Sequence, residues 1–111
     1  SEPFLLMPDT ARAFFEQLAA RTAGGSERTR GLTATYRFDV ADAGSWRVVV
    51  DDGAVTVSES DGAADCVISA PEDLFLRIVR GQQSPMGAFL MGKIRVEGDT
   101  GLAMRLKDLL G

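Results

Sequence analysis

Residues 84–110 decide the fold expected for this chain, and they read SPMGAFLMG, KIRVEGDTG and LAMRLKDLL in three consecutive blocks. The first block opens with Ser-Pro, a pair that caps and begins a helix, and its residues 86–91 carry no charge. The second block alternates polar and apolar residues over 93–97, as a strand does, and the third returns to helical spacing. A short helix that is apolar all round must be buried on every side or must line an apolar cavity, so we expect one of these two environments for residues 86–91.

Length and composition indicate a single domain, residues 1–111, with room for one hydrophobic core. The formal net charge is -4 and the basic residues are scattered among the acidic ones, which argues against nucleic acid as a partner. The stretches without charge are too short to span a bilayer, and the N-terminus lacks the pattern of a signal peptide. We therefore expect a soluble, cytoplasmic protein with no integral membrane association, either a monomer or a homodimer.

The chain contains no histidine and only one cysteine. These absences argue against most zinc sites, serine and cysteine triads, and acid-base catalysis by histidine. We expect no enzymatic activity, no metal and no cofactor. Cys66 lies in an apolar strand pattern with no histidine to activate it, so we expect a buried structural cysteine.

The first half of the chain changes from a helical period to a strand period. After an extended arm at residues 1–8, Asp9 or Thr10 can cap a helix that runs to about Thr22. Alternating runs at 32–40, 45–50, 54–59 and 65–70 predict four strands, and Asp52-Gly53 is a strong hairpin signal. We expect these strands to form an antiparallel meander with one apolar and one polar face. The expected inward face of the first helix consists of Ala11, Phe14, Phe15, Leu18 and Ala19.

Two further helices are expected at 71–80 and 99–110. Pro71 suits the start of the first, and Glu72 and Asp73 place negative charge at its positive end. The turn at 98–101 has two interpretations: a phosphate-binding turn near Lys93 or Arg95, or an ordinary cap by Asp99 or Thr100, which we favour. The expected buried residues are Leu74, Phe75, Leu76, Ile78 and Val79 in the earlier helix, and Leu102, Leu106, Leu109 and Leu110 in the last one, with Met104 at its margin.

Residues 66–74 and 84–104 together resemble the sterol carrier protein 2 family. The specific part is the run from Ala88-Phe89 through Gly92-Lys93 to Gly98-Asp99. The order of the expected elements agrees with the family over about residues 9–110.

The resemblance implies an α+β fold, with a five-stranded, mainly antiparallel sheet covered on one face by about four helices. It also implies an apolar tunnel between the sheet and the helices that takes sterols, fatty acyl chains, acyl-coenzyme A or phospholipids, with no chemistry of its own. The sequence shows no Ser-Lys-Leu tail and no preceding enzyme domain. We therefore expect a stand-alone, bacterial-type member of the family, with sterol the less favoured ligand.

The residues expected to line the tunnel are apolar side chains of the sheet and the later helices. They are Trp46, Val48, Phe75, Ile78, Val79, Met86, Phe89, Leu90, Met91, Met104 and Leu106. The alternative is that they only fill the core. An empty pocket of roughly 300 Å³ would cost on the order of 7 kcal/mol at about 24 cal/mol per Å³, so a tunnel without ligand should be filled or partly collapsed.

The sequence thus predicts a carrier for a lipid or another elongated apolar ligand, with the last helix as a gate. The second hypothesis is a dimerisation or accessory module of the same fold, with a collapsed interior, serving an enzyme of a lipid or quinone pathway.

Overall fold

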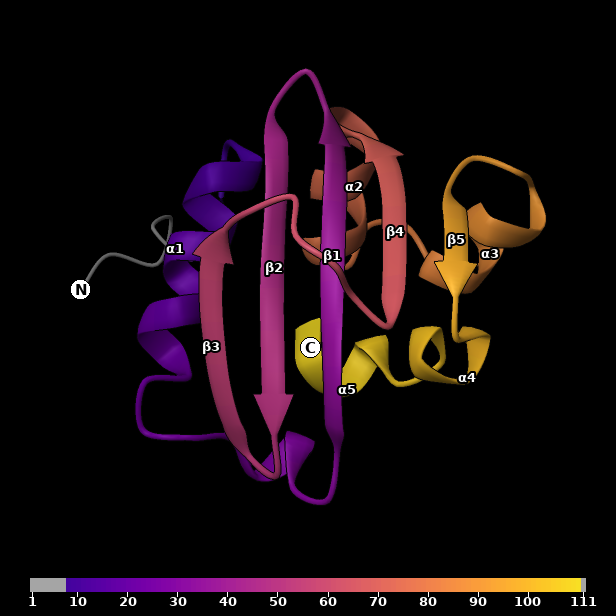
Figure 1. Ribbon diagram of the computed structural model, residues 1–111. Helices are drawn as coiled ribbons and strands as arrows, with labels where there is room; N and C mark the ends of the chain where they lie inside the picture. Colours follow the sequence, from indigo (N-terminus) through magenta and orange to yellow (C-terminus); the bar gives the residue numbers. More distant parts are fainter. Residues whose placement is uncertain (1–7, 111) are drawn as a thin grey trace.

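A computed structural model describes residues 8–110 as one five-stranded sheet with helices packed on one of its faces (Figure 1). Of the extended arm expected over residues 1–8, residues 1–7 lie outside the described residues. The strands, in the spatial order β3-β2-β1-β4-β5, are β1 (Thr33–Ala41), β2 (Gly44–Asp51), β3 (Ala54–Glu59), β4 (Cys66–Pro71) and β5 (Arg95–Gly98). The helices are α1 (Ala11–Arg21), the 3-10 turn η2 (Glu27–Thr29), α2 (Glu72–Val79), α3 (Pro85–Leu90), α4 (Thr100–Ala103) and α5 (Leu106–Leu110). The expected α+β class is confirmed.

The expectation of a four-stranded meander is wrong, because β4 does not pair with β3. It lies beside β1 and runs parallel to it, with Phe38 opposite Ile68, while the other strand pairs are antiparallel. The period of a strand predicts which face a residue occupies but not which strand it will pair with. Here residues 60–65 carry the chain back across β2 and β1 before β4 begins, over the face opposite the helices (Figure 1).

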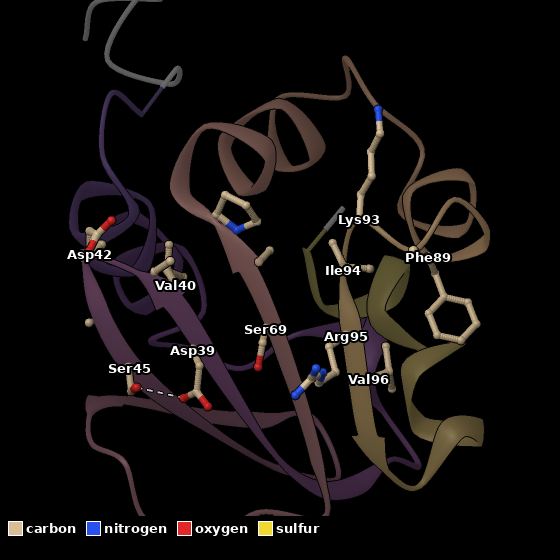
Figure 2. Close-up of a pocket in the computed structure, with 16 residues that line it drawn as sticks. Asp39, Val40, Asp42, Ser45, Ser69, Phe89, Lys93, Ile94, Arg95 and Val96 are labelled. Carbon is tan, nitrogen blue, oxygen red and sulfur yellow. Dashed lines mark hydrogen bonds between the residues drawn. The ribbon is translucent and has the colours of Figure 1, made fainter.

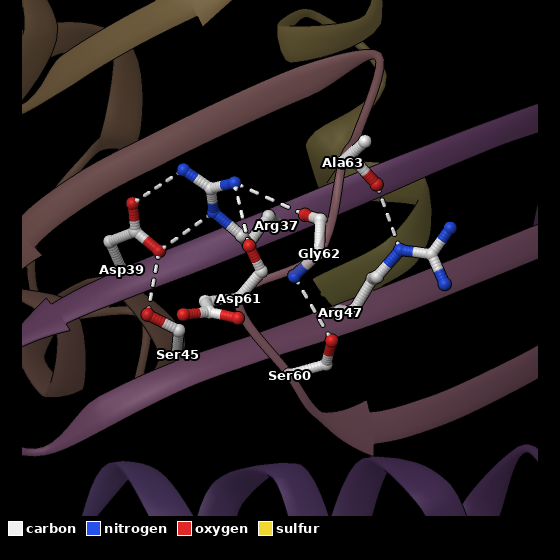
Figure 3. A network of polar contacts seen from close by, with 8 residues as sticks. All are labelled: Arg37, Asp39, Ser45, Arg47, Ser60, Asp61, Gly62 and Ala63. Atoms are coloured by element: carbon white, nitrogen blue, oxygen red, sulfur yellow. Dashed lines mark hydrogen bonds and ion pairs between the residues drawn. The ribbon is translucent and has the colours of Figure 1, made fainter.

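Two arginines fasten this crossing segment to the sheet (Figure 3). Arg37 forms a two-pronged ion pair with Asp39, at 3.0 and 3.1 Å, and also donates to the carbonyl oxygen of Gly62 at 3.1 Å. Arg47 donates to the carbonyl oxygen of Ala63 at 2.8 Å. Because these carbonyl groups have no ladder partner, the guanidinium groups supply the hydrogen bonds that the irregular segment needs.

The core forms between the sheet and the helices, as the alternation predicted. Inward-facing side chains of β1, β2 and β4 are buried, while their neighbours on the other face stay partly exposed. Phe15 of α1 stacks on Trp46 of β2, with ring centroids 4.9 Å apart, and on Phe75 of α2 at 5.5 Å. Thr10 caps α1 by accepting a hydrogen bond from the amide of Ala13 at 3.0 Å. These contacts fix α1 and α2 side by side under the sheet.

The last helix, expected as one element over 99–110, is two short helices in the structure. Asp99 accepts hydrogen bonds from the amides of Gly101 and Leu102, so the ordinary cap is confirmed. The break follows Ala103, and the carbonyl oxygen of Leu102 accepts a hydrogen bond from the hydroxyl of Tyr36 at 2.7 Å. In a continuous helix that carbonyl would accept from the amide four residues later, but here it also accepts from the amide of Arg105, three residues later, at 3.0 Å. The sheet therefore takes part in ending α4.

Gly98 provides a test of the turn between β5 and α4. Its φ is +88°, and a Cβ at this position would collide with the carbonyl oxygen of Asp65. Gly98→Ala should lower the free energy of unfolding by about 3 kcal/mol, since strained backbone and a displaced carbonyl add together. Gly81 is the matched control, because its φ is +78° but no heavy atom lies within 4 Å of its added Cβ.

Gly81→Ala should lower the free energy of unfolding by only about 1 kcal/mol, which is the cost of the backbone strain alone. Urea unfolding of both variants makes the measurement, and equal losses would refute the role given to Asp65.

Candidate functional site

Helix α3 lies at the surface and exposes most of its apolar side chains. The exposed large apolar residues, here called the apolar patch, are Met86 (47% exposed), Phe89 (42%), Leu90 (76%), Met91 (67%) and Met104 (66%). Only Ala88 of this helix is buried. The expectation that residues 86–91 are buried on every side is wrong. Helix α3 has only six residues, so one short face of it packs against the rest of the protein. That these residues line a ligand cavity stays a prediction.

The backbone of α3 is fixed at both ends, so this exposure is built into the local structure. Ser84 caps the helix by accepting from the amide of Gly87 at 3.2 Å. At the other end, the amide of Lys93 donates to the carbonyl oxygen of Ala88 at 2.9 Å, and Gly92 takes a φ of +72°. Ala88 and Ile94 are buried and hold the segment against the protein. The large side chains of the segment, Met86, Phe89, Leu90 and Met91, stay exposed.

Packing around α3 is sparse compared with the rest of the fold. The strands contact one another closely, and α1 and α2 contact each other, whereas α3 makes few contacts with any other element of residues 8–110. Elements with few buried contacts are the first to move in a native protein. Helix α3 is therefore the part of the described chain best suited to shift when something binds.

The eleven residues predicted to line a tunnel fall into three environments. The buried ones, which belong to the packed core, are Trp46, Val48, Phe75 and Leu106. Ile78 and Val79 are partly buried and pack against that core. The other five are the apolar patch. The patch belongs to α3 and to the residues that cap the C-terminal ends of α3 and α4, Met91 and Met104. Both helices lie at the β5 side of the sheet, whereas Trp46 lies on β2 (Figure 1).

An open hollow of about 980 Å³ lies between the β1–β2 hairpin and β5 (Figure 2). Its apolar lining includes Phe89, Ile94 and Val96 on one side and Val40 and Ala70 on the other. Its polar part includes Asp39, Ser45, Ser69, Lys93 and Arg95. Sequence analysis did not include Ile94 and Val96 among the lining residues. The alternation over 93–97 carried the necessary signal, because it placed Ile94 and Val96 on the same face of that segment.

The charges in this hollow are unequally paired. Burial opposes ionisation of Asp39, but hydrogen bonds from Arg37 and Ser45 outweigh it and lower the pKa of that carboxyl group. The Ser45 hydroxyl donates to Asp39 at 2.8 Å. Within residues 8–110, Lys93 and Arg95 are exposed and have no ion-pair partner. The hollow therefore holds one paired carboxylate, Asp39, together with Asp42, Lys93 and Arg95, for which no ion pair is present within residues 8–110.

Tyr36 connects the centre of the sheet to α4. Its side chain is fully buried, and its hydroxyl donates to the carbonyl oxygen of Leu102 at 2.7 Å. Burial, with a smaller contribution from Cys66, raises the pKa of Tyr36 to about 12. The phenol therefore stays protonated and keeps its hydrogen bond to α4 over the ordinary pH range.

The structure gives no chemical role to the single cysteine. Cys66 is buried, as predicted, and burial followed by the charges of Asp99 and Asp65 raises the pKa of its thiol. A thiol with a raised pKa is a poor nucleophile. In the described part of the chain, no three potential metal ligands lie together, and no helix is long and apolar enough to cross a bilayer.

Comparison with known proteins gives a family match over most of the chain. The family model described as the SCP-2 sterol transfer family matches residues 15–111. Sterol carrier protein 2 of Homo sapiens is 33% identical over 91 residues, which cover 77% of this chain and 17% of that protein. Hydroxysteroid dehydrogenase-like protein 2 of Xenopus laevis is 32% identical over 89 residues, 77% of this chain and 21% of that protein. The chain spans only about a fifth of the length of these relatives.

Solved structures share the fold. Sterol carrier protein domain 2 of Helicoverpa armigera matches with a TM-score of 0.74 at 22% identity, over 99% of this chain and 90% of that one. Sterol carrier protein 2 of Aedes aegypti, in complex with the C16 fatty acid palmitate, matches with a TM-score of 0.68 at 22% identity, over 88% and 91%. The mixed sheet with helices on one face is therefore the fold of these proteins.

The Tyr36 hydrogen bond predicts a specific response to alkaline pH. The phenol loses its proton near its ordinary pKa of 10.0 in the unfolded chain, but only near about 12 in the folded protein. The unfolded state therefore binds fewer protons in this interval, and the free energy of unfolding should fall as pH rises through it. Tyr36→Phe should remove this pH-dependent contribution. At neutral pH, the loss of the hydrogen bond should lower the free energy of unfolding by about 1 kcal/mol.

Urea unfolding at neutral and alkaline pH tests both effects. An unchanged alkaline slope in Tyr36→Phe would show that other groups cause it.

Proposed function

The chain belongs to the SCP-2 sterol transfer family, and on that premise we propose that it carries a lipid whose apolar part rests against α3 and α4. The ligand class is a fatty acyl chain, an acyl-coenzyme A, a sterol-like molecule or a phospholipid. The apolar patch is the observation that supports the proposal most directly. Five large apolar side chains on a stable backbone expose a surface that water solvates poorly, and a lipid chain covers such a surface favourably.

The composition of the patch suits a ligand of variable shape. Three of its five members are methionines, whose unbranched side chains adapt to neighbours of different outline. Each methylene group that leaves water contributes roughly 0.8 kcal/mol, so a long acyl chain needs few specific contacts to bind. The sparse packing of α3 allows it to move away from the sheet and admit the chain beside Ala88.

In this proposal the ligand reaches inward from the patch toward Ile78, Val79 and Leu106. These residues pack at the helix side of the core, and the movement of α3 would open a path to them. Trp46 and Val48 lie deeper, under α1, and contact the ligand only if it extends along the sheet. The last helix, expected as the gate, is held to the sheet by the Tyr36 hydrogen bond to Leu102, so in this proposal α3 moves while α4 and α5 stay in place.

In this proposal the protein binds its ligand and releases it without changing it chemically. Transfer is driven by apolar burial alone, in an intracellular setting, by a monomer or a homodimer.

A second candidate function is a docking or dimerisation module that serves a lipid or quinone pathway enzyme. The observation that favours it is again the apolar patch, which no other part of residues 8–110 covers. A solved structure named UbiJ-SCP2 ubiquinone synthesis protein shares the fold with a TM-score of 0.67 at 20% identity. This candidate predicts a stable oligomer and indifference to lipids, which sedimentation velocity with and without a fatty acid distinguishes from a carrier.

A binding titration with a pyrene-labelled fatty acid tests the carrier function. Phe89→Ser combined with Met104→Ser should weaken binding at least about tenfold, because each change removes a large apolar side chain from the ligand surface. Both positions are exposed, so the fold should persist. Val49→Ser is the control: this half-buried valine on β2 faces the side of the sheet without helices, and its loss should leave the affinity unchanged.

The proposal fails if wild-type protein shows no saturable binding, or if the control weakens binding as much as the double variant. Mass spectrometry of gently purified protein adds an independent check, because a carrier should retain lipid from its host.

A further inference from the structure

We propose that a cluster of buried aromatic rings limits the length of the apolar chain that this protein binds. The rings, here called the ring cluster, belong to Phe14, Phe15, Phe38, Trp46 and Phe75. The inference rests on the proposed carrier function and narrows its ligand class to acyl chains short enough to end at Phe75. Beyond that residue, the space between the sheet and the helices is filled by the protein's own rings.

The rings come from three layers of elements and hold one another in place. Phe15 of α1 stacks on Phe75 of α2 and on Trp46 of β2, with interplanar angles of 19° and 14°. Phe14 and Phe38 meet the ring of Phe75 edge-on, with centroids 5.5 and 6.1 Å away. The five side chains are at most 4% exposed. Because each ring is enclosed by others, one ring turns only when its neighbours also move.

The proposed path of the ligand leads to this cluster along α2. Ile78 and Val79, toward which the ligand reaches, are partly buried, and Phe75 precedes them by three and four positions on the same helix. Residues at this spacing share one face of a helix and are about 5 Å apart along its axis. A chain that extends along this face from Val79 therefore meets the ring of Phe75 after about one helical turn.

The other side of the path is closed by α4 and α5. The hydroxyl of Tyr36 donates to the carbonyl oxygen of Leu102, and Leu106 and Leu109 are buried in the core. On β1, the ring of Tyr36 lies 6.3 Å from that of Phe38, a member of the ring cluster. The ligand thus has a boundary on each side, the ring cluster on one and the tethered α4 and α5 on the other.

The gain from a longer chain is too small to open the ring cluster. Each methylene that leaves water tightens binding about fourfold, so two further methylenes contribute about fifteenfold. Moving Phe75 aside breaks its contacts with three other rings at once. An aromatic pair is worth about fivefold in an equilibrium constant, and three pairs correspond to roughly a hundredfold. We therefore expect affinity to stop rising once the end of the chain reaches Phe75.

A series of saturated fatty acids from octanoate to palmitate tests this limit in the wild-type protein by titration calorimetry. Affinity should rise about fourfold per methylene among the shorter members and become constant before palmitate. A rise that continues at the same rate to palmitate overturns the length limit but leaves the carrier function intact. If none of the fatty acids binds saturably, the carrier function itself is refuted, and the length limit with it.

Phe75→Leu removes the ring and keeps an apolar side chain at the boundary. Palmitate should bind this variant about tenfold more tightly than wild type, because further methylenes become buried, while octanoate affinity stays unchanged. The control is Val50→Ala, a core change on β2 outside the ring cluster at a residue that is 1% exposed. It should leave the ratio of palmitate to octanoate affinity at the wild-type value. A merely structural role of Phe75 would change both affinities alike.

Trp46 is the only tryptophan of the chain and gives a second measurement. Bromine quenches tryptophan emission only at short range, and Trp46 is separated from Phe75 by the ring of Phe15. Palmitate brominated at its terminal carbon should leave Trp46 emission unchanged in wild type and lower it in Phe75→Leu. Quenching in wild type, an unchanged palmitate affinity in folded Phe75→Leu, or an equal gain in Val50→Ala overturns the proposal. If Phe75→Leu does not fold, the two wild-type measurements decide.

Discussion

The parallel pairing of β4 with β1 is the contact on which the arrangement of the whole molecule depends. It makes β1 the central strand, with β2 and β4 as its neighbours. It also obliges residues 60–65 to cross the face opposite the helices, where Arg37 and Arg47 hold them (Figure 3). Since one side of β4 is occupied by β1, β5 pairs with its other side and forms the edge of the sheet. Helices α3 and α4 lie at this edge (Figure 1).

The two sides of the sheet differ in how firmly their helices are held. Under β2 and β1, the rings of Phe15, Trp46 and Phe75 stack together, and Glu72 of α2 accepts a hydrogen bond from the amide of Ala11 at the start of α1. At the β5 side, α3 depends on one buried alanine and on its own caps. A rigid half beside a loosely attached half allows a ligand to enter without unfolding the core, which is consistent with the proposed carrier function.

Most elements were predictable because their signals are local. Thr10 caps α1, Asp52 and Gly53 take the positive φ of a hairpin turn, and Asp99 caps α4, each as the residue types indicated. The break between α4 and α5 was not predictable, because Tyr36 lies far from Leu102 in the sequence. The parallel position of β4 was missed for a similar reason: alternation fixes the buried face of a strand and contains no information about its neighbour.

The sequence by itself determined most of the elements, the buried face of each strand and the family pattern around Phe89, since these follow from periodicity and from residues close together in the chain. Only the tertiary structure decided that Trp46 is packed under α1 while Leu90 and Met91 face outward. The same apolar helix can be buried in one fold and exposed in another. Which of the two occurs depends on how much apolar surface of the neighbouring elements is still uncovered for the helix to pack against. Here α1, α2 and α5 contribute side chains to that core, and α3 buries only Ala88.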